Sequence, residues 1–534
     1  EPALLIRIID ILLPHYEDRS DTESLLFLYI CAGFSYMELS RTGEPTSRDK
    51  TIYFYTKVLS YRDQIEFFES AASRDYIFIA YYNLIRVAPG LGILDIETAY
   101  RLWEELCQIR TMPKFCQYDT TNPRIPQLCD RAINDFRAYG AVLNVERVIA
   151  PSAILSSLEN MTQVYYAEIL HEHGSIYECP VFTVFNYHYV QARNGTITWE
   201  AAWQILDDYY VHKMQTIGQV SSPDLLAFYT NLPLNLIDVL GHTHFKEEFK
   251  QATYRRYRNL ITSYLMNQPA SLNSYTLNNG VQLVAFHPLI LGTFQNRMEK
   301  MNFIVDLVVT RHLTTFTHSV MVSYLAEAIG KHILAARPEL LRIPSSYLEG
   351  NVYASPAEVL DYIVPAALFH DIGKNGMIPI INTQHRKLND YEFNIIQTHP
   401  QKGSDYLSSD PDFLIYQPVA LGHHRSYDGT RGYPLSFDNT ASPYRDAIDL
   451  IHICDCLDAA TDYLSRNYHR AKPFDVVLNE LKAGRGTEYN PDMVDVILSD
   501  RELYNDLKML TEQNRENIYY DIYLTFVNLR KKRQ

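Results

Sequence analysis

The sequence predicts an all-α protein, because helical patterns account for most of the chain. In residues 95–109, Ala99, Leu102, Trp103 and Leu106 recur at helical spacing and define one apolar face. Capping residues precede an apolar run in "SDTESLLFLYI", which indicates a helix start. The Tyr-rich stretches "SRDYIFIAYYNLIRV" and "TYRRYRNLITSYLMN" have the length of globular helices. We therefore predict a helical C-terminal domain after a mostly helical N-terminal region.

The chain divides into three predicted regions. Residues 1–140 suggest successive helical hairpins, faintly like tetratricopeptide repeats, but they show no repeat at a fixed period, so an irregular bundle is the simpler interpretation. Residues 141–296 are interpreted as a mostly helical sensory or interaction region, by analogy alone. The polar stretch 267–280 is a candidate boundary. Residues 297–534 form the third predicted region, which contains the candidate functional histidines and aspartates.

Two short apolar runs leave the element type open. Residues 181–190 and 281–286 fit either short strands or buried helix segments, since periodicity cannot separate the two at this length. The pattern after Asn194-Gly195 is clearer, because Thr198 is a good N-cap for a helix that begins at the next residue.

Composition and charge exclude several classes of protein. The 534 residues are 47% hydrophobic and 21% charged, as in ordinary globular proteins. A net charge of −15 argues against a general nucleic-acid binder. The 7 cysteines form no CxxC pair, which argues against zinc fingers and thioredoxin-like sites and agrees with a reducing compartment such as the cytoplasm.

No segment has the pattern of a membrane span or a signal peptide. The apolar run at 25–34 is too short to cross a bilayer, so we expect a buried core helix there. No charged region followed by a cleavage site is present. The chain begins with Glu1 instead of Met, as a fragment of a longer protein would.

The last third of the sequence holds an ordered set of histidines and aspartates next to apolar residues. Unpaired charges are costly in such surroundings, so a partner is expected for them. Imidazole and carboxylate donors without cysteine suit divalent Fe, Mn, Zn or Co. Five histidines and two aspartates are too many for one ion and suit two, and an aspartate directly after a ligand histidine could bridge them. The set comprises His318, His370, Asp371, His399, His423, His424 and Asp455.

The order H…HD…H…HH…D, with "HDIGK" and a later "GYP" at 432–434, resembles the HD-GYP domains. These are bacterial members of the HD-domain metal-dependent phosphohydrolases. The resemblance covers roughly residues 300–534 and includes the closing segment at 484–498. It implies that the third region is an HD-type helical domain.

The resemblance also assigns roles. The seven histidines and aspartates match the metal ligands, with Asp371 as the bridging carboxylate, and Lys374 matches the lysine that contacts the scissile phosphate. Arg466 and Arg470 resemble basic residues that hold the substrate, and Tyr433 is either a substrate contact or a loop stabiliser. The implied reaction is hydrolysis of cyclic di-GMP, or a close relative, to a linear dinucleotide by a hydroxide held between two metal ions.

The substrate-facing segments depart from the family pattern. Arg425 stands where an acidic residue is usual after the paired histidines, and "DGTRGYP" carries one extra residue. His469 replaces a family-like lysine unless Arg470 takes its place. These changes leave the ligand set intact, but they leave open an HD phosphohydrolase for another phosphoester or a silent nucleotide-binding module.

We expect two ions, Fe or Mn, and not three. Some HD-GYP domains hold a third metal through a Glu one helical turn before the first ligand histidine, where this chain has Thr314. His385, His452 and His469 match no ligand position and are interpreted as structural or solvated. The expected partners are a cyclic dinucleotide, a protein or sensory ligand of the N-terminal region, and a second copy of the chain; no nucleic-acid polymer is expected.

Overall fold

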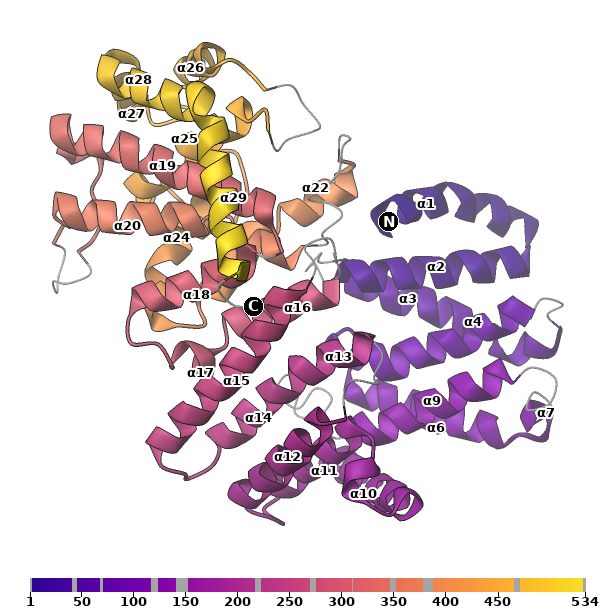
Figure 1. Cartoon of the computed structure of the whole chain (residues 1–534). Coiled ribbons are helices and arrows are strands. Elements are labelled where there is room, and N and C mark those ends of the chain that lie inside the picture. Colours follow the sequence, from indigo (N-terminus) through magenta and orange to yellow (C-terminus); the bar gives the residue numbers. More distant parts are fainter. Residues whose placement is uncertain are drawn as a thin grey trace. The chain divides into compact units, whose positions relative to one another are not determined.

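The computed structural model describes most of the chain, and it is helical throughout (Figure 1). No β-strand forms among the described residues, which contain only three isolated β-bridges. The all-α prediction is therefore confirmed. The described ranges are 2–40, 46–67, 71–116, 123–140, 152–216, 222–268, 275–309, 311–345, 352–377, 388–464 and 471–531.

Two compact units make up the chain. The first contains Glu1–Leu225 and Asn235–Lys250, and the second contains Leu226–Leu234 and Gln251–Gln534. The predicted boundary after residue 140 borders on residues outside the described ranges, and the one after residue 296 falls inside the second unit. The three-region division remains a prediction. Among the described residues, no helix is both long enough and apolar enough to cross a bilayer.

In the first unit, helices that follow one another along the chain pack together in turn, as helical hairpins do. Two of them begin at side-chain caps: the Asp95 carboxylate accepts from the Thr98 N–H, and the hydroxyl of Thr198, the predicted cap, accepts from the Ala201 N–H. The helices that lie in this unit or extend from it are α1 (Pro2–Arg19), α2 (Thr22–Ser40), α3 (Ser47–Leu59), η1 (Arg62–Phe67), α4 (Ala71–Tyr82), η2 (Asn83–Val87), α5 (Ala88–Gly90), α6 (Ile96–Thr111), α7 (Pro113–Cys116), α9 (Arg124–Tyr139), α10 (Ser152–His173), η3 (Ile176–Glu178), α11 (Val181–Arg193), α12 (Trp199–Met214), α13 (Ser222–Tyr229) and α14 (Asn231–Gly241).

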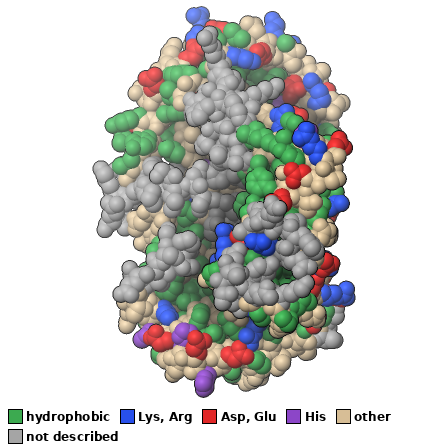
Figure 2. Space-filling model, turned by 90° about the vertical axis from the view of Figure 1, so that its right-hand side faces the viewer, with side chains coloured by type: hydrophobic (Ala, Val, Ile, Leu, Met, Phe, Trp, Pro, Cys, Tyr) green, Lys and Arg blue, Asp and Glu red, His purple; other side chains and the backbone are tan. Residues whose placement is uncertain are grey.

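The open choice between strand and helix is settled as helix. Residues 181–190 lie in α11, which packs against α9, α10 and α12, and residues 281–285 lie in α16. The apolar run at 25–34 lies in α2, where Leu26 is fully buried, as predicted for a core helix. On the face shown in Figure 2, the described Lys and Arg side chains lie in small groups near Asp and Glu side chains instead of forming one continuous basic surface.

The second unit is built around the long helix α19, which packs against both α20 and α25. Its helices are α15 (Glu247–Asn267), α16 (Tyr275–Ala285), α17 (Pro288–Leu291), α18 (Arg297–Val309), α19 (Leu313–Ala336), η5 (Pro338–Leu340), α20 (Pro356–Phe369), η6 (Ile372–Gly376), α22 (Asp390–Ile396), α23 (His399–Leu407), η7 (Pro411–Tyr416), α24 (Gln417–Gly422), α25 (Arg445–Thr461), α26 (Phe474–Ala483), α27 (Pro491–Ser499), α28 (Arg501–Lys508), η8 (Met509–Gln513) and α29 (Arg515–Lys531).

A close approach of backbone to backbone joins η6 to α23. A Cβ atom added to Gly373 would lie 2.0 Å from the carbonyl oxygen of His399 and 2.5 Å from the backbone nitrogen of Gly403. Only glycine fits between these rigid atoms. The contact holds the segment that follows Asp371 directly against the start of the helix that carries His399.

We expect Gly373→Ala to lower the free energy of unfolding by about 1–3 kcal/mol, because a methyl group here must push two backbone segments apart. Denaturant titration of the purified variant measures this. Gly280→Ala in α16 is the matched control, since its added methyl group would meet nothing nearer than 3.9 Å. Equal stability of the Gly373 variant and the wild type would contradict the close-packing argument.

Candidate metal centre

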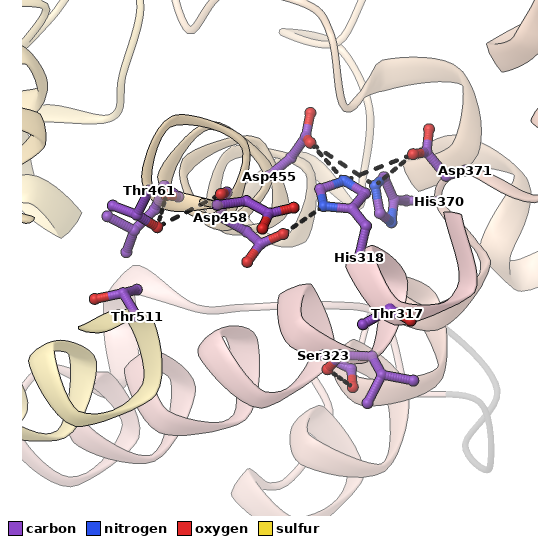
Figure 3. Close-up of polar contacts among 12 residues, drawn as sticks. Thr317, His318, Ser323, His370, Asp371, Asp455, Asp458, Thr461 and Thr511 are labelled. Carbon is purple, nitrogen blue, oxygen red and sulfur yellow. Dashed lines mark hydrogen bonds and ion pairs between the residues drawn. The ribbon is translucent and has the colours of Figure 1, made fainter. Parts of the chain in front are cut away.

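Seven histidine and aspartate side chains from five separate segments converge in the second unit. Figure 3 shows four of them, His318, His370, Asp371 and Asp455, pointing toward one another. His318 comes from α19, His370 and Asp371 from the end of α20, and His399 from the first position of α23. His423 and His424 follow α24, and Asp455 lies on α25. All seven predicted ligands are thus brought together. They form three overlapping groups whose donor atoms lie within 4.8 Å of one another.

Asp371 lies between two groups of histidines. Its Oδ1 is 3.1 Å from Nε2 of His399 and 3.6 Å from Nε2 of His423. Its Oδ2 is 3.6 Å from Nε2 of His318 and 3.5 Å from Nε2 of His370. One carboxylate oxygen therefore faces each group, which is the arrangement that a carboxylate bridging two ions requires.

Asp455 spans the same two groups. Its Oδ1 is 3.0 Å from Nε2 of His318, and its Oδ2 is 3.6 Å from Nδ1 of His424. The sequence led us to expect one bridging carboxylate, Asp371; Asp455 is a second buried carboxylate in the cluster, placed between His318 and His424.

Backbone carbonyls fix the tautomer of three histidines. Nδ1 of His370 contacts the carbonyl oxygen of Ala367 at 2.6 Å, and Nδ1 of His399 contacts that of Ile396 at 2.6 Å. Nδ1 of His423 contacts the carbonyl oxygen of Ala420 at 3.0 Å. Since a carbonyl oxygen only accepts, each Nδ1 carries the proton, and each Nε2 presents a lone pair to the centre.

These lone pairs face other acceptors. Nε2 of His399 lies 3.1 Å from Nε2 of His423 and 3.1 Å from Oδ1 of Asp371, so bare nitrogens and a carboxylate oxygen meet in a buried space. Nε2 of His370, Nε2 of His424 and Oδ1 of Asp371 are buried without a hydrogen-bond partner. Burying nitrogen and oxygen lone pairs together without a partner is costly in free energy. A divalent cation bound by these atoms would remove that cost.

The pKa values agree with a ligand role. Burial lowers the pKa of His370 to about 3 and that of His399 to about 4, so both imidazoles are neutral near pH 7, as metal ligands must be. Burial alone would raise the pKa of Asp371, but the Lys374 cation and the His370 imidazole hold it well below its usual range.

His318 is the exception among the histidines. Burial alone would lower its pKa, but hydrogen bonds to Asp455 and Asp458 outweigh this effect and raise the pKa to about 9. Its Nδ1 lies 2.6 Å from Oδ2 of Asp458. A carboxylate on the far nitrogen of a ligand histidine fixes the ring and raises its basicity. Asp458 was not predicted, although its spacing of three residues from Asp455 places both on one face of α25.

We expect metal binding to release one proton from His318 at pH 7–8. The metal-free imidazole is protonated below pH 9, whereas a ligand imidazole must be neutral, so the apparent affinity for Mn²⁺ should rise by up to about tenfold per pH unit until it levels off near pH 9. Calorimetric titrations in Hepes and Tris, which differ in ionisation heat, count the protons. Heats independent of the buffer at pH 7.5 would contradict this assignment.

Lys374 and Tyr433 both lie at the centre. Lys374 Nζ forms an ion pair of 2.5 Å with Oδ2 of Asp371. The lysine that we predict to contact phosphate is thus paired with the predicted bridging aspartate in this structure. The Tyr433 ring lies 4.5 Å from the ring of His424, between centroids. A contact of either side chain with substrate remains a prediction. Arg466, Arg470, His385 and His469 lie outside the described residues.

Arg425, the departure from the family pattern, organises the loop that carries Tyr433. Its buried guanidinium donates to the carbonyl oxygens of Gly429, Arg431 and Gly432. Gly432 has a φ of 85°, and an added Cβ would lie 1.8 Å from the carbonyl oxygen of His424. The arginine thus satisfies three carbonyl groups of the longer loop, which gives it a structural role.

His452 has a structural role, as interpreted from the sequence. Its Nδ1 donates to the carbonyl oxygen of His423 at 2.6 Å, and its Nε2 lies 3.3 Å from Glu488. Glu488 belongs to the closing segment, whose backbone also accepts from the N–H of Tyr427. This segment therefore supports both the paired histidines and the loop after them.

The fold and the centre define a helical protein with a buried histidine–aspartate cluster that could bind metal, a donor set of the kind that metal-dependent phosphohydrolases use. Residues 315–467 match the family model described as "HD domain". With the GYP segment at 432–434, this part of the chain is similar to HD domains of the HD-GYP type.

Several curated proteins are similar to part of this chain. A "Cyclic di-GMP phosphodiesterase" of Vibrio cholerae is 26% identical over 303 residues, 51% of this chain and 60% of the relative. The "Cyclic di-GMP phosphodiesterase response regulator RpfG" of Xanthomonas campestris is 33% identical over 146 residues, 27% of this chain and 37% of the relative. A "3'3'-cGAMP-specific phosphodiesterase 2" of Vibrio cholerae is 25% identical over 203 residues, 38% of this chain and 37% of the relative. The chain thus spans between about a third and three fifths of the length of these three relatives.

Proposed function

We propose that the protein is a metal-dependent phosphodiesterase that hydrolyses a cyclic dinucleotide, cyclic di-GMP or a close relative, to a linear dinucleotide. The observation that carries this proposal is the position of Asp371, whose two oxygens each face a separate pair of histidines. The names of the relatives, which include enzymes for cyclic di-GMP and for 3'3'-cGAMP, support the substrate class.

The residues divide the work as follows. His318 and His370 would hold one ion and His399 and His423 the other, with Asp371 and Asp455 between them; His424 lies beside Asp455 Oδ2. When bound, the ions lower the pKa of a water molecule and neutralise charge on the phosphoryl oxygens. Lys374 adds a fixed positive charge at the same place. No Ser or Cys nucleophile is needed. We propose that the ions are Fe or Mn, because the ligand set consists of imidazoles and carboxylates without cysteine. We propose two ions and not three, because Thr314 is exposed and offers no carboxylate for a third.

The test is incubation of fully metallated, reduced protein with a panel of cyclic di-GMP, 3'3'-cGAMP and cyclic di-AMP, followed by chromatography of the products. A linear dinucleotide as first product supports the proposal. Turnover of another phosphoester with none of the panel would favour the second candidate, an HD phosphohydrolase of different specificity. That candidate draws on the longer loop, which places Tyr433 beside His424. No turnover of any ester would favour a silent binding module.

The region outside the HD match is proposed to regulate the site by binding a protein or a small ligand. Its helices pack in succession along the chain, an arrangement that suits binding surfaces. A cytoplasmic location and a homodimer belong to the same proposal. Light scattering of the purified chain tests the dimer.

A further inference from the structure

A buried arginine far along the sequence contacts the carboxylate that orients His318. Arg515 is the first residue of α29 and is 0% exposed, and Asp458 is also 0% exposed. The Arg515 guanidinium lies 2.8 Å from Oδ1 of Asp458, while the other oxygen, Oδ2, lies 2.6 Å from Nδ1 of His318. The chain of contacts therefore runs from α29 through α25 to α19 and ends at a metal-facing imidazole.

Arg515 is itself held in one orientation. Its Nη2 donates to the Thr461 hydroxyl at 2.8 Å, its Nε donates to the Thr511 carbonyl oxygen at 3.0 Å, and its Nη1 donates to the Tyr519 hydroxyl at 3.2 Å. Asp462 adds a second carboxylate at 3.7 Å. A planar guanidinium fixed by this many partners presents its charge at a defined place. Its position is therefore determined independently of any metal.

We propose that Arg515 is a positioning residue of the metal centre. Its guanidinium holds Oδ1 of Asp458, so that Oδ2 faces Nδ1 of His318, and His318 is thereby held with Nε2 toward Asp371 and Asp455. Residue 515 lies outside the match to the HD domain at 315–467, so the centre depends on a helix beyond that match. The inference rests on the metal-dependent function proposed above, but it concerns only how the chain holds the ion.

The test measures the affinity of metal-free protein for Mn²⁺ by calorimetry. Arg515→Met keeps most of the volume and removes the charge, and we expect the affinity for the more affected ion to fall by about 10–100-fold, the usual effect of losing such an orienting contact. Arg515→Lys should recover part of the loss, because it restores a charge. Asp458→Asn should show the same loss, and the double variant should show no more than Asp458→Asn alone.

A packing control separates positioning from folding. Ile522 belongs to the same helix and packs against Met321 of α19, without contact to Asp458. Ile522→Ala should lower the thermal midpoint of the metal-free protein but leave the Mn²⁺ affinity within about twofold. Wild-type affinity in Arg515→Met, or an equal loss of affinity in Ile522→Ala, would overturn the proposal.

Two further outcomes are informative. If Arg515→Met does not fold, the double variant, which removes both partners of the Arg515–Asp458 pair, takes its place, and wild-type affinity in that variant or in Asp458→Asn overturns the proposal. Because the readout is metal affinity, a protein that hydrolyses no cyclic dinucleotide still tests the role of Arg515. Failure of the proposed function and failure of this inference are thus distinguishable.

Discussion

Replacing Asp371 by asparagine should reduce turnover by about 10³-fold or more and lower the bound metal to at most one ion per chain. The variant keeps the shape of the side chain but removes the negative charge and converts one oxygen into an amide nitrogen that cannot bind a cation. That atom would face either His399 and His423 or His318 and His370, so one group of ligands loses its shared oxygen. Metal analysis of the purified variant and a turnover assay measure the two effects.

Asp449→Asn is the matched control for Asp371. Asp449 is also a buried carboxylate, 3% exposed on α25, and accepts from the Asn490 amide, but it faces none of the seven ligands. We expect this variant to keep its metal and activity within about threefold. If Asp371→Asn or Asp371→Ala retained the metal content and activity of the wild type, the bridging assignment would be wrong.

Replacing Lys374 by methionine should reduce turnover by about 10²–10³-fold while the metal content stays the same. The fixed charge 2.5 Å from Asp371 is expected to stabilise negative charge on the phosphate, an effect that appears in turnover. A cation beside a ligand carboxylate also repels incoming metal, so Mn²⁺ affinity should be equal to or tighter than that of the wild type.

Lys331→Met provides the control, because Lys331 is exposed on α19 and pairs with Glu327 of the same helix. Metal content and single-turnover rates should be measured on the same preparations. A Lys374 variant that loses metal in proportion to activity would assign the lysine to metal binding or folding instead of phosphate contact.

The ligand set was accessible from sequence because its members stand next to each other or follow a fixed order along the chain. His370 and Asp371 are adjacent, and so are His423 and His424. In the structure the seven side chains lie together, and their role as ligands stays a prediction. Helix starts in the C-terminal region are also encoded locally, because a cap such as the Ser355–Glu358 capping box involves residues only three positions apart.

The supporting contacts were not accessible in the same way. Nothing in the sequence relates Arg515 to Asp458, because their contact depends on how α29 returns to α25. Residues 181–190 left strand and helix open, since alternating β-branched and aromatic residues suit both, and packing against α9, α10 and α12 decided for helix. From the sequence, Arg425 suggested an altered substrate specificity. In the structure its guanidinium donates to three carbonyl oxygens of the loop that follows, so it stabilises that loop.

The three histidines whose Nδ1 protons point at backbone carbonyls have a consequence for how the protein experiences metal shortage. Carbonyl groups of α20, α22 and α24 fix the orientation of these three rings, so we expect their Nε2 atoms to keep the same positions when no metal is bound. Under the proposed function, metal depletion should therefore leave the protein folded but inactive. Renewed metal supply would then restore its activity at the rate at which ions reach the site, with no new synthesis or refolding.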